Sequence, residues 1–307
     1  MKRRGRLLLA LAPLALAAAF LHTFSAAPLP APPPLQDPLP PATPPPGMSL
    51  HHLPTGVTHR SAAFAYRGGS FSDRRDFTMS AALIKHPRGD ILIDTGFGRS
   101  IDAQFATMPF YFRATTSYET ATPAADQLDA IGHAREGLRV LLTHAHWDHV
   151  SGLADLPGVP VLVTAEERRF IAEGGWISAV ARDLEGVHYA TYAFTDGPYL
   201  GFTASHDLYG DGAIVIVPAP GHTPGSVVVF VALPTGRRYA FIGDLAWQHE
   251  GVADREERPW LQRCLADHDP ALVRADLLRM AAILARFPAI TIVPAHDARA
   301  FAELPPL

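Results

Sequence analysis

The stretch Thr143-His144-Ala145-His146-Trp147-Asp148-His149 decides how this chain folds. It directly follows Val140–Leu142, a run of consecutive apolar residues that predicts a short strand buried on both faces. Three imidazoles and one carboxylate within six residues are hard to explain as packing, because buried imidazole nitrogens need hydrogen-bond partners. In an extended chain the first two histidines share one face, whereas the aspartate and the last histidine come where the chain turns toward a helix. The stretch therefore indicates metal ligands, with enough donors for two ions.

Three more ligand-type residues stand just past the ends of other predicted strands. They are His222 in Pro-Gly-His-Thr-Pro-Gly after Ala213–Val217, Asp244 in Ile-Gly-Asp after Tyr239–Ile242, and His296 in Pro-Ala-His after Ile290–Val293. Sheet-based sites gather their functional groups at such positions. One histidine after a strand is most often structural, but the set as a whole favours a shared metal site.

The remaining pattern mixes strands and helices. Apolar runs at Ala81–Lys85 and Ile91–Asp94, separated by a turn-rich stretch, predict a hairpin. Val159–Val163 and Val227–Leu233 predict further strands, and Thr164-x-x-Glu167 matches a capping box that opens a helix. Other expectations are an irregular region with short helices over residues 97–137 and a helix from Pro270, after the N-cap Asp269, to about Arg286. Two similar halves of this kind favour two sheets covered by helices.

Composition limits the chemistry of the site. The 307 residues are 48% apolar and 18% charged, which suits a folded α/β protein and excludes general disorder. The single cysteine, Cys264, cannot form an internal disulfide or a cysteine-rich zinc site, and we interpret it as a packed or surface thiol. Fifteen histidines stand against that one cysteine, so any metal would be held by imidazole and carboxylate.

The N-terminal 47 residues do not belong to the predicted domain. Residues 1–27 place a basic cluster before the apolar run Leu7–Leu21 and the small residues Ser25-Ala26-Ala27, which is the order of a secretory signal peptide. The run is short for a membrane span of ~20 residues, and Pro28 is a poor residue after a cleavage site, so an uncleaved N-terminal anchor is the alternative. Either reading predicts an exported protein, periplasmic or secreted, with anchoring in the inner membrane as a variant.

Residues 28–47 are expected to form a stiff linker, because 11 of the 19 residues from 28 to 46 are proline. The folded domain would then span residues 48–307. The net charge of the whole chain is −4, and the removed segment is basic, so the domain is more acidic still. Such a domain repels phosphate backbones, which argues against nucleic acid as a partner and leaves a small-molecule substrate.

Taken together, the motifs resemble the metallo-β-lactamase-fold hydrolases over residues 60–300. The resemblance rests on H-x-H-x-D-H, the Gly-His-Thr-Pro-Gly histidine, the Gly-Asp pair, the terminal Ala-His and the upstream Ile93-Asp94-Thr95-Gly96. It implies an α/β fold, a four-layer αβ/βα sandwich in which helices flank two mixed β-sheets. It also implies a binuclear metal centre that uses a hydroxide between two ions to attack a carbonyl.

Specific roles follow by matching these motifs. The resemblance assigns His144, His146 and His222 to one metal, assigns Asp148, His149 and His296 to the other, and makes Asp244 the bridge. Nitrogen and oxygen donors without thiolate suit two Zn²⁺ ions, and iron or manganese also fits. Asp148 is in addition the expected catalytic residue, which orients the nucleophile and passes a proton to the leaving group. Asp94 either orients a ligand or caps a turn.

Within this family the layout resembles lactonases and organophosphate hydrolases, so a lactone or ester is the favoured substrate. The aspartate at the bridging position argues against true β-lactamases, and the acidic balance argues against thioester hydrolases of the glyoxalase type. Phosphotriesters, thioesters and β-lactams stay as alternatives, as do a non-catalytic binding module and a mononuclear iron oxygenase. Such lactonases often carry tyrosine three residues after the bridging aspartate, where this chain has Trp247, which has an N–H donor but no phenol.

Several aromatic residues precede the ligand stretch. Three roles stay open for these residues: they could line a substrate pocket, cover the sheet or form a homodimer contact. The residues are Phe105, Phe110, Tyr111, Phe112 and Tyr118. Core packing is the preferred interpretation for Trp147 and Trp176. Histidines outside the motifs are interpreted as surface or structural residues: His51, His52, His59 and His206.

Overall fold

The computed structural model describes residues 16–307, and the start of the predicted leader lies outside the described residues. A long hairpin forms one side of the larger sheet: β1 (Ser49–Ser61) and β2 (Arg74–Lys85) pair antiparallel along almost their whole length. A register shift between Pro54 and Gly56 interrupts the pairing. The expected hairpin at residues 81–94 is present, since β2 pairs antiparallel with β3 (Ile91–Ile93).

The larger sheet has seven strands in the order β4-β1-β2-β3-β5-β6-β7. Its other strands are β4 (Glu119–Thr120), β5 (Arg139–Leu141), β6 (Pro160–Thr164) and β7 (His188–Tyr192). The strands β3, β5, β6 and β7 pair parallel, so the loops that follow them leave the sheet at one edge.

The second sheet has five strands in the order β12-β11-β10-β9-β8. They are β8 (His206–Asp207), β9 (Ile214–Pro218), β10 (Val227–Ala232), β11 (Arg238–Phe241) and β12 (Ile290–Val293). Only β11 and β12 pair parallel, which makes this sheet mixed as well.

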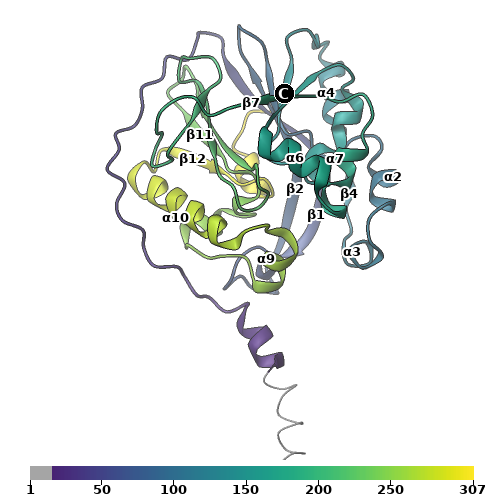
Figure 1. Ribbon diagram of the computed structural model, residues 1–307, viewed down its shortest axis with the longest axis vertical. Helices are drawn as coiled ribbons and strands as arrows, with labels where there is room; N and C mark the ends of the chain where they lie inside the picture. Colours follow the sequence, from purple (N-terminus) through teal and green to yellow (C-terminus); the bar gives the residue numbers. More distant parts are fainter. Residues whose placement is uncertain (1–15) are drawn as a thin grey trace, which may run out of the picture.

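Helices cover the outer face of each sheet (Figure 1). The larger sheet carries α2 (Ile101–Ala106), α3 (Phe110–Thr115), α4 (Ala124–Ala130), α5 (Trp147–Val150), α6 (Ala165–Glu173) and α7 (Ala179–Asp183). The smaller sheet carries α8 (His249–Ala253), α9 (Trp260–Ala266) and α10 (Pro270–Arg286), and α11 (Ala298–Phe301) follows the last strand. Short 3₁₀ turns lie at Ala62–Phe64, Ser151–Asp155, Trp176–Ser178 and Gly243–Leu245.

Three apolar clusters correspond to the three interfaces between these layers. The middle cluster joins Ile84, Ile93 and Leu141 of the larger sheet to Ile216 and Val229 of the smaller one. The other two lie between each sheet and its helices. The predicted αβ/βα four-layer sandwich is therefore confirmed.

The sequence signals for the start and end of α10 (Pro270–Arg286) were also correct. The Asp269 side chain accepts hydrogen bonds from the backbone N–H groups of Ala271 and Leu272, and Pro270 occupies the first helical position. The helix ends at Arg286, as the apolar spacing predicts. The region of residues 97–137 contains three short helices, in line with the expectation of short helix and loop.

The proline-rich segment does not extend away from the domain, as a free linker would. Residues 28–45 form neither helix nor strand, yet they run along the second sheet and α10 (Figure 1). Leu29 exchanges two hydrogen bonds with Arg255, Asp37 accepts from Gly201, and Thr43 donates to the Asp211 carbonyl. We call residues 28–47 the strap.

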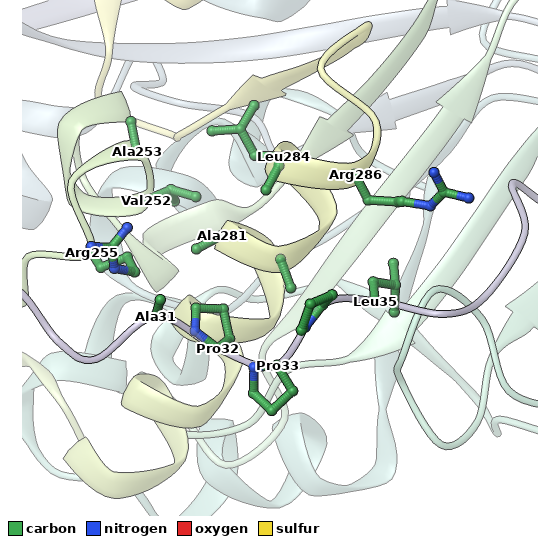
Figure 2. A pocket seen from close by; sticks show the side chains of 13 residues that line it. Ala31, Pro32, Pro33, Leu35, Val252, Ala253, Arg255, Ala281, Leu284 and Arg286 are labelled. Carbon is green, nitrogen blue, oxygen red and sulfur yellow. The ribbon is translucent and has the colours of Figure 1, made fainter.

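The strap lines an open cavity of about 400 Å³ together with α8 and α10. Its walls are Ala31, Pro32, Pro33 and Leu35 from the strap and residues such as Val252, Ala281 and Leu284 from the helices (Figure 2). Among the helices in the described part of the chain, none has both the length and the apolar character needed to cross a membrane.

Candidate metal centre

Seven ligand-type side chains meet where the strand ends of the two sheets face each other. They come from the loop and helix after β5, the β9–β10 loop, the turn after β11 and the loop after β12: His144, His146, Asp148, His149, His222, Asp244 and His296. All are buried except Asp148, which is partly exposed. The structure thus brings together every residue that the motifs single out.

The seven side chains form two groups with ligand atoms within 4.8 Å of one another. One group is His144, His146, His222 and Asp244, and the other is Asp148, His149 and His296. In the first group, Nε2 of His222 lies 2.9 Å from Nδ1 of His146. In the second group, Nε2 of His296 lies 3.5 Å from Oδ2 of Asp148.

Asp244 faces both groups with different oxygens. Its Oδ2 lies 3.2 Å from Nε2 of His222 and 3.9 Å from Nε2 of His144. Its Oδ1 lies 3.0 Å from Nε2 of His296 and 3.4 Å from Nε2 of His149. This is the placement that a bridging carboxylate needs.

Polar atoms without partners test whether a metal fits this site. Nε2 of His144, Nε2 of His149 and Oδ1 of Asp244 are buried and have no hydrogen-bond partner in the described chain. Each such atom costs about 1–3 kcal/mol unless something coordinates it. Imidazole nitrogen and carboxylate oxygen are donors for zinc, iron and manganese, so the residues present fit divalent metal ions.

The buried charges of the site shift the pKa values of its groups in different directions. Burial, followed by the charges of neighbouring histidines, holds the pKa of His144 well below its ordinary value, and the pKa of His146 falls for the same reasons. Burial alone would raise the pKa of Asp244, but the charge of His296 and contacts with three histidines hold the pKa well below its usual range. Burial would also lower the pKa values of His149, His222 and His296, but nearby carboxylates raise them. Metals bind neutral imidazole and ionised carboxylate, so these three histidines would release protons when a metal binds.

Asp94 orients two parts of the ligand stretch from behind. Its carboxylate accepts from the backbone N–H and the hydroxyl of Thr143, each at 2.7 Å, and lies 2.8 Å from Nδ1 of His149. The second ring nitrogen of His149, Nε2, therefore faces Asp244. Asp94 has a positive φ of 53°, a conformation that aspartate tolerates better than most residues. Between the two expected roles, the contacts support ligand orientation.

Two more ligand-type histidines, His296 and His222, have hydrogen-bond partners for their Nδ1 atoms. Nδ1 of His296 lies 3.0 Å from the carbonyl oxygen of Thr78, and Nδ1 of His222 lies 3.0 Å from Oδ1 of Asp267. Arg258 in turn forms an ion pair with Asp267. Such partners fix the tautomer of a ligand histidine. Asp267 and Arg258 lie in no motif, so neither could be identified from the sequence.

Glu167 joins two ligand loops, a role that the capping-box motif does not predict. The Thr164 side chain accepts from the Glu167 N–H, as expected for an N-cap. The Glu167 carboxylate, however, accepts from the backbone N–H of Ala145, the Thr223 hydroxyl and the Gly225 N–H. It therefore clamps the loop of His144 and His146 to the loop of His222.

Trp247 directs its indole N–H at the site. Nε1 donates to Oδ2 of Asp244 at 2.8 Å, and the Arg258 guanidinium lies 4.9 Å above the indole ring. The only donor of this side chain is therefore used within the protein.

The aromatic residues before the ligand stretch divide into two sets. Phe105, Phe112 and Tyr118 pack with Trp147 against the core of the larger sheet, which agrees with the covering role and with core packing for Trp147. Trp176 packs at the edge of the same cluster, whereas Phe110 and Tyr111 on α3 are exposed. Cys264 is an exposed thiol outside the site.

Comparison with known proteins agrees with this geometry. The family model of the metallo-beta-lactamase superfamily matches residues 75–296, which is most of the chain and spans all seven ligand-type residues. The chain therefore belongs to the metallo-β-lactamase superfamily.

Relatives by sequence include a probable metallo-hydrolase of Mycobacterium tuberculosis, 30% identical over 82% of this chain and 81% of that protein. An N-acyl homoserine lactonase of Rhizobium radiobacter is 24% identical over 72% of this chain and 82% of its own length. These relatives support a metal-dependent hydrolase.

Solved structures show the same fold at low identity. An N-acyl homoserine lactone hydrolase with N-hexanoyl-L-homoserine at its catalytic metal centre has a TM-score of 0.66, 17% identity, and coverage of 84% of this chain and 96% of that one. A dizinc quorum-quenching lactonase has a TM-score of 0.56, 16% identity, and coverage of 82% and 88%.

Proposed function

We propose that this protein is a binuclear metallo-hydrolase that cleaves a lactone or a carboxylic ester. The observation that carries the proposal is the placement of Asp244, whose two oxygens face two separate groups of ligand atoms. A site for a single ion would need no carboxylate between two such groups. The lactonases among the relatives and structural neighbours support a carbonyl substrate.

Each side chain has a stated task in this proposal. His144, His146 and His222 hold one ion, Asp148, His149 and His296 hold the second, and Asp244 contributes one oxygen to each. Two divalent cations bound there, zinc in our proposal with iron or manganese as alternatives, would supply an ionised water as nucleophile and polarise the carbonyl of the substrate.

Asp148 is the proposed catalytic residue of the chain itself. It is the one member of the seven that is not fully buried, so its carboxylate can reach the reacting atoms from the solvent side. There it would orient the attacking water, take up its proton and deliver the proton to the leaving oxygen. Trp247 holds Oδ2 of Asp244 and offers no phenol to the substrate.

A panel assay on the purified full chain tests the proposal. The protein is loaded in turn with zinc, iron or manganese and offered lactones, aryl esters, phosphotriesters, thioesters and β-lactams. We expect lactone or ester hydrolysis that disappears after chelation and returns with metal. Preferred turnover of one of the other classes would replace the substrate assignment, and undiminished activity after metal removal would contradict the metal centre itself.

A matched pair of variants separates the site from general damage. Asp148→Ala should abolish turnover, whereas His59→Ala replaces an exposed residue of β1 that pairs with Asp76 away from the seven ligands. Retained turnover in Asp148→Ala at normal metal content would contradict its catalytic role.

A further inference from the structure

The end of the predicted leader is built into the folded domain. Phe24 is buried, and its ring lies 5.1 Å from Phe71 and 5.9 Å from Phe64, both in the connection between β1 and β2. The Gly68 N–H donates to the Phe24 carbonyl, and Arg67 donates to the carbonyls of His22 and Ser25. The peptide groups around the expected cleavage site are thus bound by one loop.

The contact continues directly beyond that site. The Ala27 N–H donates to both carboxylate oxygens of Glu256, at 2.8 and 3.0 Å. Glu256 is buried, so loss of this donor would leave a buried carboxylate without a hydrogen-bond partner, which is unfavourable. Leu29 is then held by its two hydrogen bonds with Arg255. The chain from residue 22 to residue 29 is therefore packed against the folded domain.

Exposed apolar side chains gather at the same end of the molecule. The N-terminal helix leaves the domain at the lower end of its long axis, where α3 and α9 also lie (Figure 1). Large apolar side chains are exposed there: Phe110 (76%) and Tyr111 (48%) on α3, Trp260 (52%) and Leu265 (57%) on α9, and Phe71 (54%) beside Phe24. We call these five residues the apolar pole. Single exposed apolar side chains are common, and it is their grouping at one end of the molecule, beside the N-terminal helix, that points to an interaction surface.

The occupant of the apolar pole follows from the sequence that adjoins it. The helical residues Leu16, Phe20 and Leu21 are also exposed and belong to the apolar run Leu7–Leu21, which four basic residues precede. Basic residues beside an apolar run favour a bilayer with anionic lipids over a protein partner. The run is shorter than the ~20 residues of a full span, which would draw the residues that follow it to the level of the headgroups.

We propose that the exported chain keeps its N-terminal segment as a membrane anchor and that the apolar pole rests on the lipid bilayer. Phe24, Arg67 and Glu256 fix the anchor to the domain, so the domain would hold one orientation on the membrane rather than swing on a linker. α9 in the pole is followed directly by Asp267, the partner of His222, so the membrane face and the metal centre share one element.

Intact-mass analysis of the exported full chain tests the first half of the proposal. We expect the uncut mass, and protein that stays with the membrane fraction in high salt and in carbonate. A chain that begins at Ala27 or Pro28 in the soluble fraction would overturn it.

Fluorescence quenching tests the second half. The full chain is reconstituted into phosphatidylethanolamine–phosphatidylglycerol vesicles that contain brominated phosphatidylcholine. We expect quenching that is smaller in Trp260→Phe than in the wild type, because Trp260 is the exposed tryptophan of the pole. Equal quenching of both proteins would show that α9 does not touch lipid and would overturn the docked orientation.

Surface variants supply the matched control. Leu265→Ser combined with Phe110→Ser should increase exposure of the domain to protease on the vesicles at least severalfold. Ile131→Ser, an equally exposed apolar site (47%) at the end of α4 in the opposite half of the long axis, should not (Figure 1). A stable dimer of the full chain through the pole in detergent-free solution would instead make a second copy the occupant and contradict the bilayer.

Discussion

The two sheets contribute to the metal centre in different ways. The larger sheet supplies four ligand-type residues from one segment of six residues after β5, His144 to His149. The smaller sheet supplies three, each from the end of a different strand. The first set is placed by local chain geometry, whereas the second depends on the pairing of β9, β10, β11 and β12. Variants on each side therefore report on different properties.

The largest effect is expected where the two contributions join. Asp244→Ala removes the carboxylate that faces both ligand groups, so both ions lose an oxygen donor. We expect a fall in kcat/KM of about a thousandfold or more, because metal ions supply several kcal/mol of transition-state stabilisation. Kinetics and metal analysis of the same sample check this. A variant with both ions and near-normal turnover would show that the two sheets do not meet at Asp244.

Asp94→Ala tests the hydrogen bonds that hold the ligand segment His144 to His149 in place. The variant leaves Nδ1 of His149 and the Thr143 donors without their common acceptor. Loss of such a partner of a ligand histidine lowers metal affinity or activity by about 10- to 100-fold. We expect the loss in metal titrations, with turnover largely restored at saturating metal. Unchanged affinity would mean that local chain geometry alone places His149.

Glu167→Ala tests the clamp between the two contributions. Three donors lose their acceptor at once, one beside His144 and two in the loop of His222. We expect a free energy of unfolding lower by about 3 kcal/mol, since each buried unsatisfied donor costs 1–3 kcal/mol and part of the loss is regained by relaxation. Urea denaturation measures the change, and Glu167→Gln, which keeps one acceptor oxygen, should lose less. Equal stability of all three proteins would contradict the clamp.

A smaller effect is expected from Trp247→Phe. The variant removes one hydrogen bond to a charged oxygen, worth about 1.5–3 kcal/mol, but keeps most of the aromatic packing. Because the metal ligands remain, we expect turnover to fall by about tenfold and metal content to stay normal. A large loss of metal would instead show that the indole holds Asp244 in its bridging position.

The smallest effect lies away from the site, on β1. Burial lowers the pKa of His52 to about 4, so the folded state favours its neutral form. The stabilisation is present above the unfolded pKa of 6.5 and is lost as the pH falls toward 4; since His52 is partly exposed, we expect about 1–2 kcal/mol. Denaturation of metal-free protein at pH 7.5 and pH 5, compared with His52→Gln, measures it. An identical loss in both proteins would assign the acid sensitivity to other groups.

The same difference between the sheets explains what could be predicted from the sequence. The ligand stretch is dense enough to be recognised by itself, and apolar runs such as Ile290–Val293 coincide with strands of the structure. His222, Asp244 and His296 became informative as a set, because each follows a strand that the pattern had already located. Of the long hairpin of β1 and β2, only the last residues of β2 were predicted, since Pro54, Gly56 and several histidines break the alternation of β1.

The contacts that support the metal ligands were the hardest part of the site to predict from the sequence. The Thr78 carbonyl, Asp267 and Arg258 act through tertiary contact between distant segments, and neither residue type nor spacing marks them. Glu167 did stand in a recognisable motif, but burial directs its carboxylate to two ligand loops rather than back to its own helix. The strap was expected as a linker because composition reports backbone stiffness and does not report what the segment packs against.

Anomalous diffraction at the zinc edge, from crystals of the metal-loaded full chain, tests the central claim most directly. The account predicts two peaks about 3.5–4 Å apart, one among His144, His146 and His222 and one among Asp148, His149 and His296, with Asp244 between them. A single peak, or peaks that do not share Asp244, would contradict the binuclear centre.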